Sequence, residues 1–337
     1  MIQLPSNRST SGVMAQVLLA LVPGMLVATW VFGPGVLLNV LMASLTAWGS
    51  EALCLRLRKR PVIVRLTDHS ALLTGWLLAL SLPPASPWWL ISLAVATAIV
   101  LGKHLYGGLG QNPLNPAMLA YCLVLISAPV SMTTLWIDPL ATPGITSAWM
   151  AFLGTAPDAA TGATALSLYR NDFTALTAIE IASHPLFREA SLGLIAGVEW
   201  VALAYLVGGL WLLFRGVMTW HAPVGLLLGL FVVAAFFAID PDSGTPVWVH
   251  MTAGATVFAA FFIVTDPVSG ATSPRGRLLF GVGVALLTYL IRTFGHYPDA
   301  IAFAVLLMNF AAPMIDHYTR PRIVGRDATI KGSGGTS

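Results

Sequence analysis

Charged residues are scarce in this chain. Asp, Glu, Lys and Arg make up 9% of its 337 residues, whereas they make up about 25% of an ordinary soluble domain. Hydrophobic residues make up 57% and are gathered in long runs, and roughly 20 apolar residues cross a bilayer as a helix. The scarcity of charge therefore excludes an ordinary soluble domain and predicts a polytopic membrane protein. The net charge of +3 is too small to indicate a nucleic-acid partner.

Cysteine is almost absent as well. Cys54 and Cys122 are the only two, they have no paired spacing, and both lie in apolar surroundings. They cannot ligate an iron–sulfur cluster or a structural zinc by themselves, so we predict that they pack in the core. The run Gly107–Gly110 is not followed by the helix-opening pattern of a phosphate loop or a dinucleotide fold. The sequence therefore predicts no metal site and no catalytic residue.

The apolar runs predict an all-α integral membrane protein with about ten transmembrane helices. The third run is short and ends in Leu82-Pro83-Pro84, which indicates an interrupted helix. In a membrane such a break is tolerated only where it is buried in protein or lines a cavity. The predicted helices cover residues 14–34, 36–55, 69–83, 87–106, 115–136, 191–213, 221–239, 247–265, 278–294 and 299–316.

A weak internal repeat relates the two halves of the chain. His69-Ser-Ala begins the third predicted helix and His250-Met-Thr-Ala lies early in the eighth; Pro116 opens the fifth and Pro298 the tenth. Five helices per repeat give the halves opposite orientations in the membrane, and binding sites often lie where such repeats meet. We therefore predict two inverted five-helix repeats. The expected divisions are a first repeat at 1–136, an outside loop at 137–190, a second repeat at 191–316 and a tail at 317–337.

The positive charges predict the orientation. If both termini are cytoplasmic, only Arg170, Arg188 and Arg292 of the 17 Lys and Arg residues lie outside. This bias fits the positive-inside rule. We therefore expect both termini of this multi-pass protein in the cytoplasm, and the loop 137–190 on the outside.

Three Gly-Ala-Thr triplets occur in the chain. Asp158–Leu166 reads DAATGATAL in the predicted outside loop, and Asp266–Pro274 reads DPVSGATSP in an inside loop. The third triplet, Gly254–Thr256, lies within the eighth predicted helix, where small residues usually allow close helix packing. Small residues are common throughout, so chance is an alternative for each.

The polar stretch before the fifth helix is unusual for a membrane boundary. It contains Gly110, Asn112 and Asn115 among glycines and prolines. A connecting turn is one interpretation. Amide side chains at a membrane boundary also line cavities and bind polar ring edges, which is the other.

Six ionisable residues lie in or beside predicted helices. Such residues are functional candidates, although long side chains near a helix end also extend to the interface. Only Glu199 is predicted well inside a helix. The six are Glu51, Asp68, Lys103, Glu199, Asp266 and Arg292.

Several motifs together point to a known family. Asp158–Leu166 matches Asp-x-x-Ser/Thr-Gly-Ala-Thr/Ser, the motif modified by the bacterial flavin transferase. Asp68–Pro84, Gly110–Ala117 and Thr265–Ser269 also recur in that family. Over about residues 12–322 the chain resembles the RnfD/NqrB membrane flavoprotein family, which serves both the Rnf ion-translocating electron-transport complex and the sodium-pumping quinone reductase. Its short N-terminus is more similar to the Rnf branch.

The resemblance implies a covalent cofactor. In the family the last Thr of the motif carries FMN through a phosphoester, which the transferase forms from FAD with release of AMP. The matching residue is Thr164, an attachment point rather than a nucleophile. Asp158, Thr161, Gly162 and Ala163 complete the motif, with Thr161 where Ser is common.

The resemblance also implies a second flavin and a function. Related proteins hold riboflavin in the membrane part, for which Gly110, Asn112, Asn115 and Asp266 are the expected contacts. The implied function is electron transfer in an Rnf-type translocase that couples ferredoxin and NAD chemistry to Na+ or H+ movement. Its partners would be other membrane and iron–sulfur subunits and a second flavinylated subunit. The alternatives are a quinone-reductase subunit and a small-solute channel or transporter, because inverted repeats also suit conduction.

Overall fold

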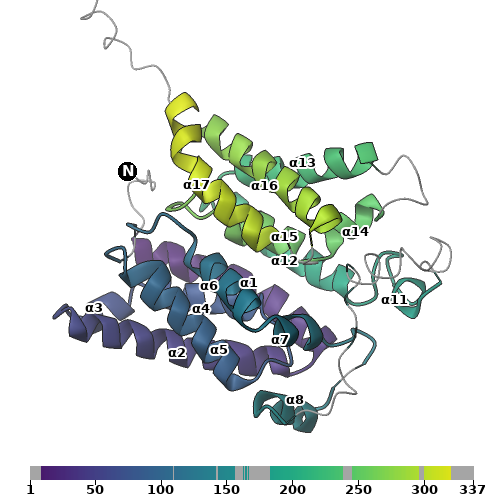
Figure 1. Cartoon of the computed structure of the whole chain (residues 1–337), viewed down its shortest axis with the longest axis horizontal. Helices are drawn as coiled ribbons and strands as arrows, with labels where there is room; N and C mark the ends of the chain where they lie inside the picture. The colour runs from purple at the N-terminus through teal and green to yellow at the C-terminus, as the bar shows by residue number, and fades with distance from the viewer. Residues whose placement is uncertain are drawn as a thin grey trace, which may run out of the picture.

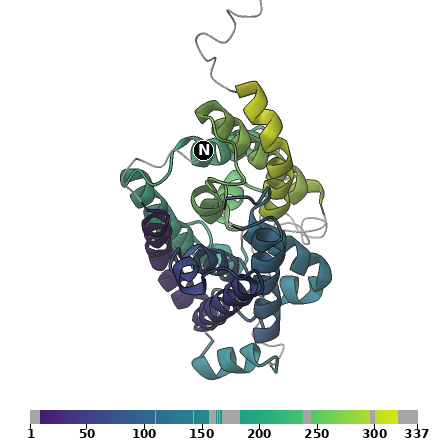
Figure 2. The ribbon, with the colours of Figure 1, turned by 90° about the vertical axis from the view of Figure 1, so that its left-hand side faces the viewer.

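The structure is a computed structural model that describes residues 9–108, 110–141, 143–155, 162, 164, 166, 183–237, 245–295 and 300–319. Within these ranges the chain forms helices and turns and no strand. In Figure 1 the helices of the first part of the chain, purple to teal, pack beneath those of the last part, green to yellow. Figure 2 views the same bundle with many of its helices nearly end-on. Much of the predicted outside loop, and the tail beyond residue 319, lie outside the described residues.

Local sequence explains where the helices of the first part begin. Ser9 caps the first helix, since its side chain accepts a hydrogen bond from the backbone N–H of Gly12 at 3.2 Å. Asn115 caps α6 in the same way, and Pro116 occupies the first turn, where no N–H is needed. The elements are α1 (Thr10–Phe32), α2 (Gly35–Leu57), α3 (Val62–Leu66), α4 (Ser70–Ala79), α5 (Trp88–Thr97), the π-helix η1 (Ala98–His104), α6 (Pro116–Ser127), α7 (Pro129–Thr134) and α8 (Ile145–Phe152).

The last part of the chain is built from similar pieces. Ser273 caps α16 by accepting from the backbone N–H of Gly276 at 2.9 Å, and Pro274 follows at the first helical position. The elements are α11 (Pro185–Arg188), α12 (Val198–Phe214), α13 (His221–Phe237), α14 (Val247–Thr252), α15 (Thr256–Phe258), the π-helix η3 (Ala259–Ile263), α16 (Pro274–Phe294) and α17 (Ile301–Thr319).

The helices are apolar enough to form a membrane protein. In the described part of the chain, α1, α2, α16 and α17 are each long and apolar enough to cross a bilayer. Five shorter apolar segments accompany them, including α12, α13 and α5 continued by η1. Each of the ten predicted segments overlaps at least one observed helix. The expectation of an all-helical membrane fold is confirmed.

Several predicted helices are shorter or broken. The fifth divides into α6 and α7 around Ala128, where Pro129 starts the new helix. The eighth divides into α14 and α15, because Gly254 and Ala255 both have positive φ (61° and 56°) and cannot continue a helix. The sixth begins at Val198 rather than 191, after a series of turns.

Glu199 was wrongly predicted to lie well inside a helix. It is the second residue of α12, and its carboxylate accepts from Ser191 Oγ and Leu192 N, both at 3.0 Å. A carboxylate at a helix N-terminus is favoured by the helix dipole and can satisfy N–H groups of the preceding loop. Glu199 therefore organises the entry to α12.

Small residues let the two parts of the chain approach closely. α1 packs along α12, and a Cβ at Gly208 would meet the backbone carbonyl of Ala20. A larger residue at position 208 would push the two helices apart. Cys54 and Cys122 are both buried, as predicted for packing residues.

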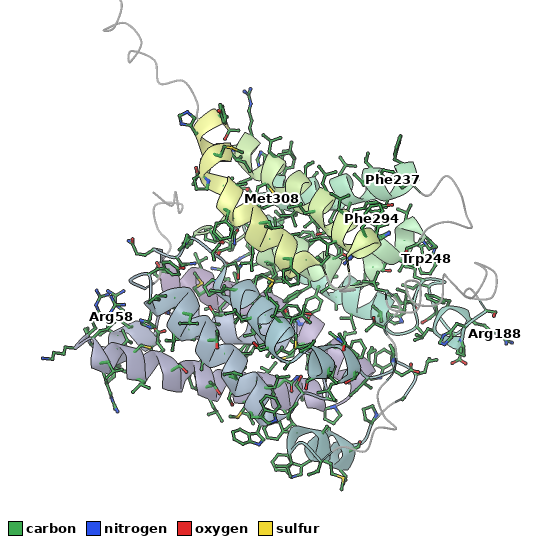
Figure 3. The ribbon with its side chains drawn as sticks, viewed as in Figure 1. Arg58, Arg188, Phe237, Trp248, Phe294 and Met308 are labelled. Carbon is green, nitrogen blue, oxygen red and sulfur yellow. The ribbon has the colours of Figure 1, made fainter. Side chains whose placement is uncertain are left out.

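The outer surface and the ends of the bundle fit a membrane setting. Large apolar side chains such as Leu45, Leu53 and Phe236 are exposed, which suits contact with lipid. Arg58 and Arg188, which the charge bias assigns to opposite sides, lie at opposite ends of the molecule in Figure 3.

Candidate functional site

A cavity of about 630 Å³ lies between the two parts of the chain. Residues of α1, α2, α6 and α7 line it from the first part, and residues of α12, α14 and α15 line it from the second. Its volume is within the range of about 300–1,000 Å³ that is typical of small-molecule sites. Thr164, the residue that the flavinylation motif singles out, is on its wall.

The segment that bears Thr164 is fixed on both sides. The backbone N–H of Gly162 donates to the carbonyl of Trp136 at 2.9 Å. A Cβ at Gly162 would lie 2.8 Å from Cβ of Asp138, so this position requires glycine. Leu166 is buried, and its cluster includes Phe187 of α11. Thr164 itself is half-buried between these anchors.

Three residues of the motif, Asp158, Thr161 and Ala163, lie outside the described residues. Of the motif, the structure thus places Gly162 and Thr164, and it places both of them on the cavity wall.

Aromatic rings make the cavity suitable for a flat ligand. Tyr205 of α12 packs edge-on against Phe258 of α15, with ring centroids 4.9 Å apart and an interplanar angle of 62°. Phe32, Tyr121 and Trp136 contribute further rings to the lining. Flat aromatic ligands stack well on such surfaces.

The interrupted third helix lines this cavity, as its prolines predict. α4 ends at Ala79, and Leu82 and Pro84 belong to the lining. The freed carbonyl of Pro83 accepts from Ser86 Oγ at 2.7 Å and Ser86 N at 3.1 Å. The break is therefore satisfied internally, which membrane depth requires.

Asn39 is a polar member of the cavity wall that sequence reasoning missed. It is 1% exposed, and its Nδ2 donates to the carbonyl of Pro83 at 3.0 Å. Its Oδ1 is buried and has no hydrogen-bond partner among the described residues. An amide within the apolar run of α2 is the signal that could have identified it.

The other two Gly-Ala-Thr triplets are engaged elsewhere. Thr256 is fully buried, and its Oγ1 donates to the carbonyls of His250 at 2.7 Å and Ala253 at 3.0 Å. Thr272 is exposed, and its N and Oγ1 donate to the two carboxylate oxygens of Asp316 at 2.8 and 2.9 Å. Neither side chain lines the cavity.

The polar side chains of the loop before α6 form hydrogen bonds within the loop and with the first turn of α6. Asn115 Oδ1 accepts from the backbone N–H of Ala117 at 3.0 Å, and Asn112 Nδ2 donates to the carbonyl of Leu114 at 3.0 Å. Gly110 has a φ of 85°, which glycine adopts without strain. Both asparagines are buried, whereas Gly110, Gln111 and Pro113 between and before them are exposed, so the loop is packed only in part.

Asn309 of α17 joins this loop to the Asp266 region. With its amide oriented to satisfy both ends, its oxygen accepts from Asn115 N at 2.9 Å and its nitrogen donates to Ser269 O at 3.2 Å. Ser269 Oγ in turn donates to Asp266 Oδ2 at 2.6 Å. Burial raises the pKa of the Asp266 carboxyl, while hydrogen bonds from Ser269 and Val268 oppose the rise. Of the four predicted second-flavin residues, Asn115 and Asp266 are thus joined through Asn309 and Ser269, whereas Asn112 donates locally to Leu114.

A buried charged cluster lies apart from the cavity. Lys103 Nζ is 2.9 Å from Glu51 Oε1 and donates to Ser70 Oγ at 2.8 Å, and Nε2 of His104 is 2.9 Å from Glu51 Oε2. Ser70 Oγ donates to Asp68 at 2.5 Å. Lys103 is 3% exposed, so it does not extend to the interface but pairs inside the bundle.

Arg292 of α16 stabilises the break between α14 and α15. Its guanidinium donates to the carbonyls of His250 at 2.8 Å and Gly254 at 3.0 Å, and to Thr256 Oγ1 at 3.0 Å. A Cβ at Gly254 would lie 2.5 Å from Nη2, so the guanidinium sits directly against this turn. Because Gly254 lines the cavity, Arg292 supports the cavity wall from behind.

Comparison with known proteins agrees with these motifs. The sequence profile of the NQR2, RnfD, RnfE family matches residues 3–325. Similar proteins include the D component of the ion-translocating oxidoreductase complex from Pseudomonas aeruginosa strain UCBPP-PA14. It is 55% identical over 333 residues, which cover 97% of this chain and 95% of the relative. Proteins of the same name from Marinobacter nauticus (48% identical, 98% and 95% covered) and Yersinia enterocolitica (45% identical, 95% and 95% covered) are also similar. The chain therefore belongs to the NQR2, RnfD, RnfE family.

Proposed function

We propose that this protein is the electron-transfer subunit of an ion-translocating oxidoreductase complex of the bacterial inner membrane, with FMN attached to Thr164 through a phosphoester. The observation that carries the proposal is that Thr164 lies on the wall of an aromatic-lined cavity of about 630 Å³. The printed name of the similar proteins supports the assignment to such a complex. The remaining membrane and iron–sulfur subunits, a second flavinylated subunit and the flavin transferase are the proposed partners.

The residues present fit an FMN group. When attached, FMN supplies one- and two-electron chemistry that no side chain of this chain provides. Thr164 supplies the hydroxyl, and Phe32, Tyr205 and Phe258 supply apolar surfaces for a flat ring. Gly162, held against Trp136, keeps the attachment segment on the cavity wall. A tether of this kind also fixes the local concentration of the cofactor.

The wider reaction is the coupling of ferredoxin and NAD chemistry to Na+ or H+ movement. It follows from the resemblance to the Rnf branch of the family rather than from the cavity. The cavity supports only the flavin-bearing step assigned to this protein, since its walls offer aromatic surfaces beside Thr164.

The two halves are proposed to be inverted five-helix repeats. Each half has a short helix that starts with a buried hydroxyl residue, Ser70 or Thr256, directly after a residue with positive φ (60° and 56°). In each half a cation from the next long helix donates to that hydroxyl, Lys103 at 2.8 Å and Arg292 at 3.0 Å. The cavity lies where the halves meet, which is the usual place for a binding site in such folds.

The proposed orientation is tested by topology reporters. Fusions after residue 150 and after residue 320 are expected to give opposite signals, with the first reporter periplasmic and the second cytoplasmic, because of the Lys and Arg bias. Alkaline phosphatase and green fluorescent protein fusions report the two sides. Matching signals at the two positions would overturn the topology.

A second, non-covalent flavin is proposed near Asn112, Asn115, Gly110 and Asp266. The network through Asn309 supports this, because it joins the Asn115 backbone to the Asp266 region beside α6 and α17. Amides and backbone groups of this kind suit the polar edge of a riboflavin ring.

Replacing Asn115 by Asp tests the second flavin without removing the helix cap. Asp caps a helix as well as Asn does, but it lacks the amide donor. We expect acid-extractable flavin per mole of protein to fall about 2- to 10-fold, since one hydrogen bond is lost. Thermal unfolding of the same samples measures the separate cost of burying the new carboxylate. Asn112→Leu should act in the same direction. Gln111→Leu, at an exposed position, is the matched control. If all three variants keep the wild-type amount of flavin, the two asparagines have only their local structural roles.

A further inference from the structure

We infer that Asn39 recognises the pyrimidine edge of the flavin ring in the cavity, with its Oδ1 accepting a hydrogen bond from the ring N3–H. The inference rests on the proposed FMN at Thr164, and it names the group that would orient the ring. Three features of Asn39 carry it: its burial, the fixed direction of its amide, and its place on the same cavity wall as Thr164.

The Asn39 oxygen is an acceptor that lacks a donor. Asn39 is 1% exposed, and within the described part of the chain its Oδ1 makes no hydrogen bond. Leaving a buried acceptor unsatisfied costs free energy, so such atoms in native proteins are usually paired with protein, water or ligand. Since Asn39 lines the cavity, a bound ligand can supply the missing donor.

The direction of the amide is fixed. Nδ2 donates to the carbonyl of Pro83 at 3.0 Å. Turning the amide over would place Oδ1 against that carbonyl, and two acceptors cannot bond to each other. Oδ1 is therefore the atom that is left for a ligand.

The chemistry of the site selects the class of ligand. Its walls include the rings of Phe32, Tyr205 and Phe258, so the ligand is flat and largely apolar, and Asn39 requires that it present a donor at its edge. An isoalloxazine ring presents an N–H between two carbonyl oxygens. An oxidised quinone presents only acceptors and leaves Asn39 unsatisfied. The wall therefore favours a flavin over a quinone as occupant.

Asn39→Leu is the first test. Leu has a similar volume and removes both polar atoms, while the Pro83 carbonyl keeps its two bonds from Ser86. We expect the denatured protein to retain its covalent flavin fluorescence. In the native protein the ratio of docked to undocked ring should fall about 3- to 10-fold, which is the effect of one lost hydrogen bond. Lower flavin fluorescence anisotropy and weaker fine structure of the visible flavin band would report this.

Ser81→Ala is the matched control. Ser81 also lines the cavity, but its hydroxyl already donates to the carbonyl of Leu77 at 2.8 Å. Removing this hydroxyl should leave the anisotropy at the wild-type value.

A modified flavin tests the same bond from the ligand side. Wild-type protein made without the transferase is loaded in vitro by the transferase with FAD or with 3-methyl-FAD, which lacks the N3–H. The methylated flavin in wild type should behave like the normal flavin in Asn39→Leu, and combining both changes should add little further loss.

The outcomes separate the two proposals. If wild type shows no flavin fluorescence after denaturation, the proposed attachment at Thr164 fails. If covalent flavin is present and Asn39→Leu has wild-type anisotropy and band shape, the Asn39 inference is overturned while the attachment stands. Full additivity of the variant and the methyl group would likewise overturn it, because the two changes would then act on different contacts.

Discussion

Replacing Thr164 by Val is expected to abolish covalent flavin in this protein. Val keeps the shape of Thr but has no hydroxyl, so no phosphoester can form at position 164. In-gel flavin fluorescence of the denatured protein should vanish, whereas Thr164→Ser, which keeps the hydroxyl, should retain it. Mass spectrometry of the peptide containing residue 164 should show the added mass of FMN minus water in wild type and be without it in Thr164→Val.

The other two Gly-Ala-Thr triplets serve as internal comparisons. Thr256 is fully buried and bonded to two carbonyls, so a negatively charged phosphodiester there would be costly to bury. From the sequence alone, Thr272 has the more favourable charges for a phosphate, because the cations Arg275 and Arg277 follow it. In the structure the Asp316 carboxylate is in direct contact with Thr272, accepting from its Oγ1 at 2.9 Å, and would repel a phosphate.

Thr272→Val is therefore expected to leave the fluorescence unchanged. A flavinylated peptide spanning residues 266–275, or full fluorescence in Thr164→Val, would falsify the assignment of the site.

Replacing Lys103 by Met is expected to destabilise the protein by about 3–5 kcal/mol, the typical cost of removing one partner of a buried ion pair. Glu51 is 2% exposed, so its carboxylate would lose the ammonium at 2.9 Å without gaining water. Ser70 Oγ would lose a donor as well. The midpoint of thermal unfolding of the protein in detergent measures the loss.

The double variant Glu51→Gln/Lys103→Met distinguishes an ion pair from simple packing. Because the uncompensated charge is then absent, the double variant should be more stable than Lys103→Met alone. Arg65→Met is the control, since Arg65 is an exposed cation on the short helix α3 and should have little effect. Additive losses in the double variant would show that Lys103 does not act through Glu51.

Sequence patterns predicted the helices well where apolar runs were long, and less well where polar side chains intervened. α1 and α2 differ from their predicted ranges by a few residues. The predicted start of α12 was seven residues too early, because the apolar residues before it have the pattern of a helix. In the structure those residues form turns, which are stabilised by Glu199 and by two glycines with positive φ. A hydropathy pattern measures apolar content, so it cannot predict that a carboxylate accepts hydrogen bonds from loop N–H groups.

The candidate site was predictable only in part. The motif around Thr164 is a local pattern, so the sequence alone predicts it, and the structure places Thr164 on the cavity wall. Asn39, Tyr205 and Phe258 were not singled out, since they come from three helices far apart in the chain. An apolar residue that faces lipid and one that faces a cavity look alike in sequence, and only packing separates them.

The sequence by itself determined that this protein lies in a membrane and where its helices approximately lie, and it predicted Thr164 as the residue that carries the flavin. These depend on composition, run length and a short motif, all of which are local. The tertiary structure alone decided that Glu51 pairs with Lys103, that Arg292 braces the turn at Gly254, and that Thr164 and Asn39 share one cavity. The physical reason is that burial and hydrogen bonding join residues distant in sequence, and these partners exist only once the helices have packed.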